Sequence, residues 1–174
     1  MIQITNKLMA MGANIEAMPT GIVTILYCAI NRQDSDFLRW ILSIHAPYTT
    51  AETLNSCLYE GQEMAHVPLY RTVLNNDLNS AKVLLDYGAN PDFSYYDLLN
   101  NEETVSRYNN ETALLLALTK HNIAFANWLL DVGAFVQLGD KGKCKGNLPL
   151  NYAQKIPTAI ADRNTLIQRI TTLM

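Results

Sequence analysis

The clearest hydrophobic pattern in the chain runs from Val67 to Ala89, with the sequence VPLYRTVLNNDLNSAKVLLDYGA. Its apolar residues follow the spacing expected for one face of two short helices. Gly88 suits the left-handed residue that ends a helix, because glycine has no Cβ that would clash in that conformation. The stretch therefore predicts a helical hairpin, made of a helix, a tight turn and a second helix.

This pattern recurs along the chain. We place four openings, and each has a leucine two residues later and a small or compact residue five residues later. After the first three openings, the tenth residue is a short polar side chain that is predicted to cap the second helix, and residues 17 and 18 are both aliphatic. A hairpin of this size cannot bury its apolar face alone, so we expect the copies to stack. The openings are Thr24, Val67, Thr112 and Leu148; the leucines Leu26, Leu69, Leu114 and Leu150; the compact residues Ala29, Thr72, Ala117 and Ala153; the caps Asp34, Asp77 and Asn122; and the pairs Ile41–Leu42, Leu84–Leu85 and Leu129–Leu130.

The openings TILYCA, TALLLA and LPLNYA are similar to the T-P-L-H-x-A motif, and the closings LLDYGA and LLDVGA match LL-x-x-GA. On these motifs the chain resembles the ankyrin repeat family from about Ile2 to Met174. The resemblance implies an all-α solenoid of stacked helix-turn-helix units with long finger loops. The histidine of the motif is replaced in every copy, so we expect looser contacts between repeats. The replacements are Tyr27, Tyr70, Leu115 and Asn151.

We expect a single ankyrin-repeat domain over residues 1–174. It comprises a half-repeat cap at about 1–23, repeats at about 24–66, 67–111 and 112–147, and a C-terminal capping repeat at 148–174. Successive openings are 43 and 45 residues apart, against roughly 33 in an ordinary ankyrin repeat. The excess falls in two finger loops, where Thr49 and Ser94 begin patterns that predict a short inserted helix in each.

Two further expectations concern the ends of helices. His45 stands where the other closings have glycine, so we predict that it is left-handed and that His45→Gly stabilises the protein by about 0.5–1 kcal/mol. A final helix is predicted from Asp162 to Met174 as a closing cap. Its expected inward residues are Leu166, Ile167, Ile170 and Leu173, and its expected outward residues are Arg163, Gln168, Arg169 and Thr172.

Composition narrows the class of function. The formal net charge of −3 argues against nucleic acid as the main partner, and no apolar run is long enough to span a membrane. The amino terminus lacks the pattern of a cleaved secretion signal. Cys28, Cys57 and Cys144 are widely separated and odd in number, so we expect free thiols and a cytoplasmic location.

No candidate catalytic, cofactor or metal site emerges. The three histidines, His45, His66 and His121, each lack a second histidine at metal-ligand spacing. Lys141, Lys143 and Lys145 form a basic stretch, but it lacks the Gly-Lys-Ser/Thr ending of a phosphate-binding loop, so a solvated loop is the better interpretation. We expect no enzyme activity.

The resemblance implies that partners bind on the concave face, formed by the first helices of the hairpins and the finger loops. Tyrosines in the insertions add candidate anchors, because tyrosine is common at binding hot spots. The predicted partner-binding residues are Arg32, Tyr48, Tyr59, Met64, His66, Asn75, Tyr95, Tyr96, Tyr108, Asn109, Glu111, Lys120, Lys145 and Asn147.

Two functions remain open from the sequence. The first is a non-catalytic, monomeric protein–protein interaction module, and the diverged motifs would suit a secreted effector that acts in the cytosol of a host cell. The second is a targeting or regulatory ankyrin domain cut from a larger enzyme or a ligase adaptor. The identity of the partner protein does not follow from either.

Overall fold

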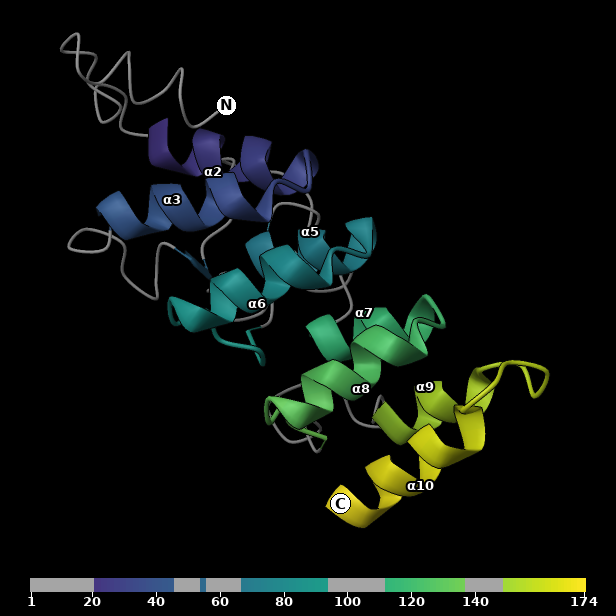
Figure 1. Cartoon of the computed structure of the whole chain (residues 1–174). Helices are drawn as coiled ribbons and strands as arrows, with labels where there is room; N and C mark the ends of the chain where they lie inside the picture. Colours follow the sequence, from purple (N-terminus) through teal and green to yellow (C-terminus); the bar gives the residue numbers. More distant parts are fainter. Residues whose placement is uncertain (1–20, 46–53, 56–66, 94–111, 137–148) are drawn as a thin grey trace, which may run out of the picture. The chain divides into compact units, whose positions relative to one another are not determined.

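The structure is a computed structural model that describes residues 21–45, 54–55, 67–93, 112–136 and 149–174 (Figure 1). All regular secondary structure in these ranges is helical, which confirms the all-α class for this part of the chain. The chain divides into two compact units, Met1–Asn90 and Pro91–Met174, and each unit is described by itself. The single ankyrin solenoid stays a prediction.

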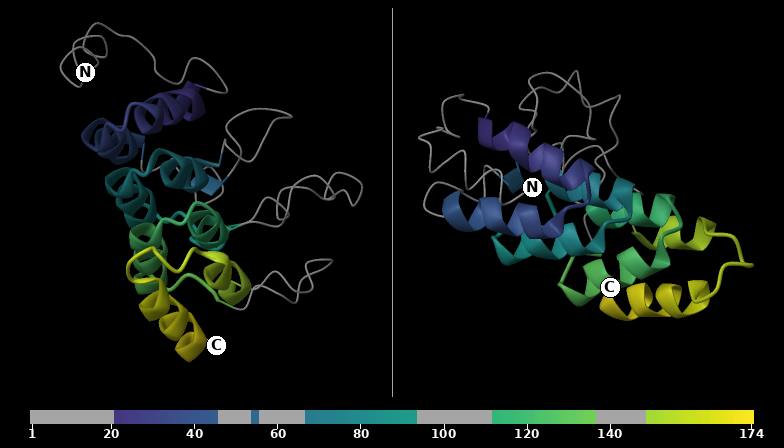
Figure 2. Two further views of the ribbon diagram at one scale, coloured as in Figure 1. Left: turned by 90° about the vertical axis from the view of Figure 1, so that its right-hand side faces the viewer. Right: turned by 45° about the horizontal axis from the view of Figure 1, so that its top comes forward.

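The described part of the first unit contains two helical hairpins. Helix α2 (Gly21–Asn31) packs against α3 (Ser35–His45), and α5 (Pro68–Asn75) packs against α6 (Leu78–Asp86). The hairpins stack in register, because α2 contacts α5 and α3 contacts α6. Figure 2 shows this pairing, with the first helices in one layer and the second helices in another.

The second unit repeats this arrangement. Helix α7 (Ala113–Thr119) packs against α8 (Ile123–Asp131), and α9 (Pro149–Lys155) packs against α10 (Arg163–Leu173). Again the first helices contact each other, α7 with α9, and so do the second helices, α8 with α10. The hairpin predicted from Val67 to Ala89 is therefore the element from which each unit is built.

The predicted caps of the second helices are confirmed. Asp34 Oδ1 accepts a hydrogen bond from Phe37 N at 2.9 Å. The side chains of Asp77 and Asn122 each accept one from the backbone N–H three residues later, both at 3.1 Å. Each cap satisfies one of the N–H groups that a helix start leaves without an intrahelical acceptor. Thr112 caps its first helix in the same way, through Leu115 N.

The predicted core positions are buried in both units. Ala29, Thr72, Ala117 and Ala153, the compact residues of the pattern, are all fully buried. The Thr72 hydroxyl donates to Leu69 O at 2.6 Å, so this polar group is satisfied although it is inaccessible to water. Of the four leucines, Leu26, Leu69 and Leu114 are buried, whereas Leu150 is half-buried.

Left-handed residues occur at two places in the hairpins that begin at Thr24, Val67 and Thr112, and Asp162, just before α10 in the last hairpin, is also left-handed with φ of 61°. Gly88 and Gly133 close α6 and α8 with φ of 93° and 86°, as predicted. The sequence did not predict the second place, which is the residue just before each cap. It holds Gln33, Asn76 and His121, with φ of 55°, 54° and 56°.

The prediction for His45 is wrong. His45 is the last residue of helix α3, and a right-handed helical residue has negative φ. Gly88 and Gly133 instead lie two residues beyond the ends of α6 and α8. Helix α3 therefore continues through the position at which the other two second helices have already ended, and the argument for His45→Gly no longer applies.

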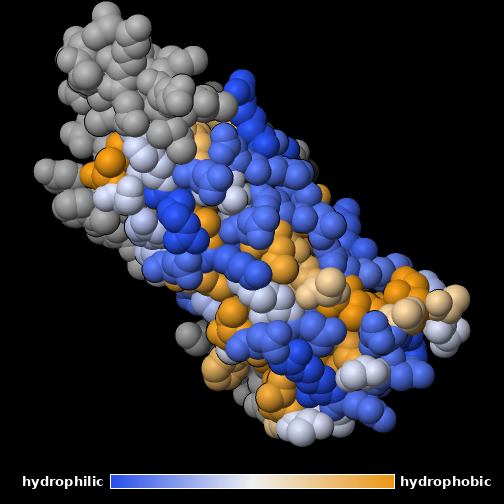
Figure 3. Space-filling model, viewed as in Figure 1, coloured by the Kyte–Doolittle hydropathy of each residue, from blue (hydrophilic) through white to orange (hydrophobic). Residues whose placement is uncertain are grey.

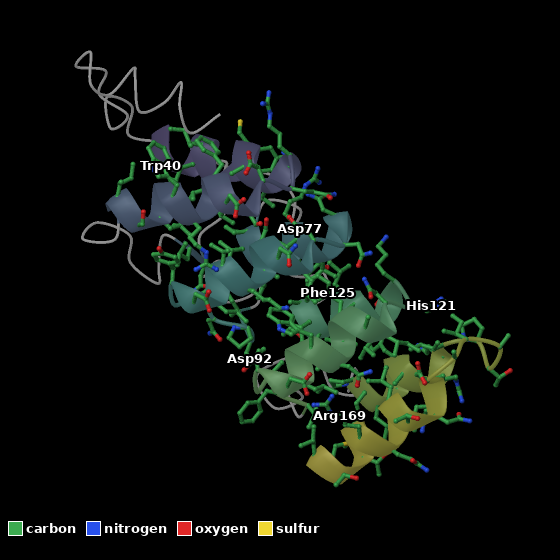
Figure 4. The ribbon with its side chains drawn as sticks, viewed as in Figure 1. Trp40, Asp77, Asp92, His121, Phe125 and Arg169 are labelled. Atoms are coloured by element: carbon green, nitrogen blue, oxygen red, sulfur yellow. The ribbon has the colours of Figure 1, made fainter. Side chains whose placement is uncertain are left out.

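The predicted faces of the last helix need correction at its end. Leu166 and Ile170 are buried as expected, but Leu173 is 51% exposed. Arg163 and Arg169, expected to point outward, bind other parts of the unit. Arg163 donates to the backbone oxygens of Ile156 and Gln154, and Arg169 reaches α8 (Figure 4).

Most of the predicted finger insertions lie outside the described residues. From the first insertion the structure describes Leu54 and Asn55, which are both helical. Leu54 is fully buried, and the Asn55 side-chain oxygen accepts a hydrogen bond from Asn90 N at 2.9 Å. The second inserted helix, which was predicted to begin near Ser94, and the half-repeat cap before Gly21 are outside the described ranges.

Candidate interaction surface

In the first unit, α2 and α5 are joined by a group of polar side chains centred on Arg71. Arg71 Nε donates to Asn31 Oδ1 at 2.7 Å. The guanidinium carbon lies 5.7 Å from the centre of the Tyr27 ring, within the range of a cation–π contact. Arg71 is the single charged residue of α5, which has the sequence PLYRTVLN. The residue is half-buried. These contacts fix the position of a positive charge on the first-helix layer of this unit.

The side chain of Asn75 has a structural role at the same contact. Its Nδ2 donates to Ile30 O at 3.0 Å, and its backbone oxygen accepts from Gln33 Nε2 at 3.1 Å. Both bonds connect the end of α5 with the end of α2. Asn75 was predicted to bind a partner, and in this structure its side-chain amide links the two hairpins.

The first helices of the second unit also carry positive charge. Lys120 is exposed in the turn after α7. Lys155, at the end of α9, has its Nζ 5.2 Å from the centre of the Tyr152 ring. Arg71, Lys120 and Lys155 form no ion pair with any carboxylate of the described residues.

The second helices carry two ion pairs, although Asp36 on α3 and Lys82 on α6 are exposed and form none with a described residue. In the first unit, Arg39 on α3 and Asp86 on α6 form an ion pair with 3.0 Å between Nη2 and Oδ2. In the second unit, Arg169 on α10 pairs with Asp131 on α8 and also donates to the Asn127 side chain (Figure 4). Exposed pairs of this kind contribute little stability, but they neutralise the carboxylates of Asp86 and Asp131.

A hollow of about 260 Å³ lies in the second unit where α8 and α10 end. Phe135 is 61% exposed, and Leu173 and Val132 are also exposed. Figure 3 shows hydrophobic residues at the surface in this region. The hollow is lined by Leu130, Gly133, Ala134, Phe135, Val136 and Leu173.

Asp92 is hydrogen-bonded to the backbone of Phe135, one of the residues that line this hollow. Its Oδ1 accepts from Phe135 N at 2.7 Å. Burial raises the pKa of the Asp92 carboxyl above its ordinary value, although the hydrogen bond from Phe135 opposes the change. A half-buried carboxylate therefore holds the segment that follows Gly133.

Three of the fourteen predicted partner-binding residues are described. Arg32 and Lys120 are exposed in the turns after α2 and α7, and Asn75 is half-buried. Tyr27 and Arg71 were not predicted from the sequence. Arg71 could have been noticed, because it is the single charged residue in the helix PLYRTVLN. Predicted residues outside the described ranges are Tyr48, Tyr59, Met64, His66, Tyr95, Tyr96, Tyr108, Asn109, Glu111, Lys145 and Asn147.

Other kinds of site find no support among the described residues. In these ranges, no three His, Cys, Asp or Glu side chains come close enough together to hold a metal ion. None of the helices described is long and apolar enough to cross a membrane. Cys28, the one cysteine in these ranges, has a free, exposed thiol.

Comparison of the sequence with models of known protein families and with curated proteins finds no match. The interpretation of function therefore depends on the hairpins and on the surfaces that they present.

Proposed function

We propose that this protein is a non-catalytic protein–protein interaction module that binds its partner through the first-helix layers and the finger loops. We also propose that its hairpins form an ankyrin-like solenoid, in which the first helices line the concave face. The partner is another protein, and the module acts as a monomer in the cytoplasm.

The observation that carries the proposal is that one hairpin is repeated in both units, and that its first helices present cationic side chains that no described carboxylate binds. In both units, first helices stack on first helices and second helices on second helices. Asp86 and Asp131 on the second helices each pair with an arginine, whereas Arg71, Lys120 and Lys155 on the first-helix layers have no carboxylate partner in the described ranges. A rigid scaffold that presents fixed polar side chains is suited to recognition.

The proposal is tested by comparing two variants of the full chain that differ in the layer they alter. The first combines Arg32→Ala, Leu74→Ala and Lys120→Ala, which are exposed residues at the ends of first helices. The control combines Asp36→Ala, Lys82→Ala and Gln168→Ala, which are exposed residues of second helices. Both variants should keep the melting temperature of the wild type to within a few degrees.

Immobilised wild type and control should retain the same proteins from a cell lysate, and the first-helix variant should lose at least one of them. Quantitative mass spectrometry of the retained proteins measures this. If all three retain the same set, the first-helix layers are not the binding surface.

A further inference from the structure

We propose that Arg71 anchors a carboxylate side chain of an acidic partner segment that lies across α2 and α5. The inference rests on the proposed function and specifies the chemistry of the partner. It is drawn from the first unit alone, in which all of the residues concerned lie.

The guanidinium of Arg71 is held in position while part of it stays free to bind. Asn31 holds Nε at 2.7 Å, and the Tyr27 ring lies beneath the guanidinium at 5.7 Å. The two terminal nitrogens form no hydrogen bond with a described residue. A guanidinium binds a carboxylate best through two parallel N–H groups, and a fork that is already held in place loses less entropy on binding. The four N–H donors of the two terminal nitrogens are thus unused by the described residues, on a side chain that is fixed by its neighbours.

Among the described residues of the first unit, no free carboxylate lies on the two helices that present Arg71. Helices α2 and α5 contain no aspartate or glutamate. The two carboxylates in the turns that follow them are caps of the next helices: Asp34 accepts from Phe37 N, and Asp77 is buried and accepts from Ser80 N. The exposed acidic residues Asp36 and Asp86 lie on the second helices α3 and α6. The charge of α2 and α5 therefore favours a negatively charged ligand.

The whole chain favours a peptide carboxylate over a polyanion. Its formal net charge is −3, and a nucleic acid surface normally requires a continuous basic patch. One arginine held by an amide and a tyrosine can recognise a single carboxylate, with neighbouring acidic residues adding steering at low salt.

The test uses the full chain and a fluorescein-labelled ten-residue peptide of alternating glutamate and serine, with binding measured by fluorescence anisotropy. Arg71→Gln should weaken binding about tenfold, since it removes a charge-assisted pair of hydrogen bonds. Arg71→Lys should recover less than half of this loss on a logarithmic scale, because lysine keeps the charge but not the fork. Lys82→Gln, which removes an exposed cation from the second helix α6, is the matched control and should change the Kd less than twofold.

Asn31→Ala provides a second variant in case the changes at Arg71 reduce folding. It leaves the guanidinium in place and removes the group that holds Nε, so binding should weaken about threefold with little change in melting temperature. The melting temperature of every variant is measured alongside.

Three results would each overturn the inference: Arg71→Lys binding as well as wild type, Lys82→Gln losing as much affinity as Arg71→Gln, or the glutamate peptide binding no better than a serine–glycine peptide. Tighter, Arg71-dependent binding of a ten-nucleotide thymidine strand or of phosphatidylserine vesicles would also overturn it, in favour of a phosphate ligand. If the first-helix variant still loses proteins from the lysate but the glutamate peptide does not bind, the proposal of an acidic partner is wrong and the proposal of an interaction module is retained.

Discussion

The Asp92 carboxylate accepts a hydrogen bond from the backbone N–H of Phe135, with 2.7 Å between Oδ1 and N. The bond joins the turn that follows Pro91 to the segment that follows Gly133, within the second unit. It holds Phe135, a residue that is 61% exposed, beside the hollow. Asp92 therefore affects both the stability of this unit and the position of Phe135.

Replacing Asp92 with asparagine should stabilise the protein at neutral pH. Burial raises the pKa of Asp92 in the folded state, so the folded protein binds more protons than the unfolded chain between the ordinary pKa of 3.8 and the raised value. Stability contributed by this group is therefore present at low pH and is lost as the pH rises through the raised pKa. The substituted amide would keep a side-chain oxygen for Phe135 N without the charge.

The measurement is urea unfolding of wild type and Asp92→Asn at a series of pH values. The stability advantage of Asp92→Asn should be largest at pH 7 and should shrink towards pH 3.8. Asp92→Ala is the control, because it removes the acceptor as well as the charge and should be less stable than Asp92→Asn at every pH. An advantage that does not change with pH would exclude the ionisation of Asp92 as its cause.

The left-handed residues before the caps offer a test of the hairpin turn. Glycine adopts this conformation without a Cβ clash, so His121→Gly should stabilise the protein by about 0.5–1 kcal/mol. Gln33→Gly should gain less, because it also removes the hydrogen bond from Gln33 Nε2 to Asn75 O. Asn76→Gly should gain less, because asparagine tolerates left-handed backbone better than glutamine or histidine. Thermal unfolding of the three variants gives the comparison.

Gly133→Ala is the opposite control for this series. Gly133 has φ of 86°, and an added Cβ would meet no atom within 4 Å, so any loss comes from the backbone conformation. We expect a loss of about 1 kcal/mol. Equal stabilisation by all three glycine substitutions, or none by any, would contradict this explanation of the turn.

The sequence predicted what depends on local spacing. The caps Asp34, Asp77 and Asn122 could be found because each binds a backbone N–H three residues away, a relationship internal to one turn. The buried compact residues could be found because their spacing repeats in all four hairpins. The all-helical class followed from the same periodicity.

The errors concern residues whose environment is set by neighbours distant in sequence. Leu173 has the spacing of an inward residue, but it lies beside an open hollow at the end of α10 and is 51% exposed. Arg169 has the spacing of an outward residue, but Asp131, 38 residues earlier, lies within reach of its guanidinium. The left-handed turn residues were missed because three different residue types occupy that position, and none of the three is glycine.

The second hairpin has a polar residue where two others have phenylalanine. Phe37 and Phe125 each contact a tryptophan three residues later, Trp40 and Trp128, with ring centres 5.8 and 5.4 Å apart. Ser80 occupies the equivalent position in α6 and is fully buried. Its hydroxyl has no hydrogen-bond partner among the described residues, and neither does the neighbouring Oδ2 of Asp77. A buried hydroxyl without a partner is unfavourable, because it has lost its hydrogen bonds to water.

Ser80→Ala should therefore stabilise the protein by about 0.5–1.5 kcal/mol, from the removed hydroxyl and the higher helix propensity of alanine. The backbone N–H of residue 80 would still donate to Asp77 Oδ1, so the cap would remain. Asp77→Ala removes that cap and should destabilise by about 1 kcal/mol, which separates the two effects in urea unfolding. Destabilisation by Ser80→Ala would mean that the hydroxyl is hydrogen-bonded in solution.

Arg169 should determine how firmly α10 is attached to α8. Its guanidinium pairs with Asp131 and donates to the backbone and side chain of Asn127, whereas the apolar contribution of α10 comes mainly from Leu166 and Ile170. Side-chain exposures of 33% for Arg169 and 62% for Asp131 limit the ion pair to about 1 kcal/mol at most. Arg169→Gln should therefore lower the global stability little, but it should speed amide exchange in α10 by local opening.

Hydrogen exchange followed by mass spectrometry distinguishes this local effect from global unfolding. Peptides from α10 should exchange about three- to fivefold faster in Arg169→Gln, while peptides from α2 and α3 should be unchanged. Gln168→Ala is the matched control, because Gln168 is exposed on the same helix and its side chain makes none of these contacts with α8. If amide exchange in α10 is accelerated equally in both variants, the cause is a change in the stability of the helix and not the loss of the contact with α8, because only Arg169→Gln alters that contact.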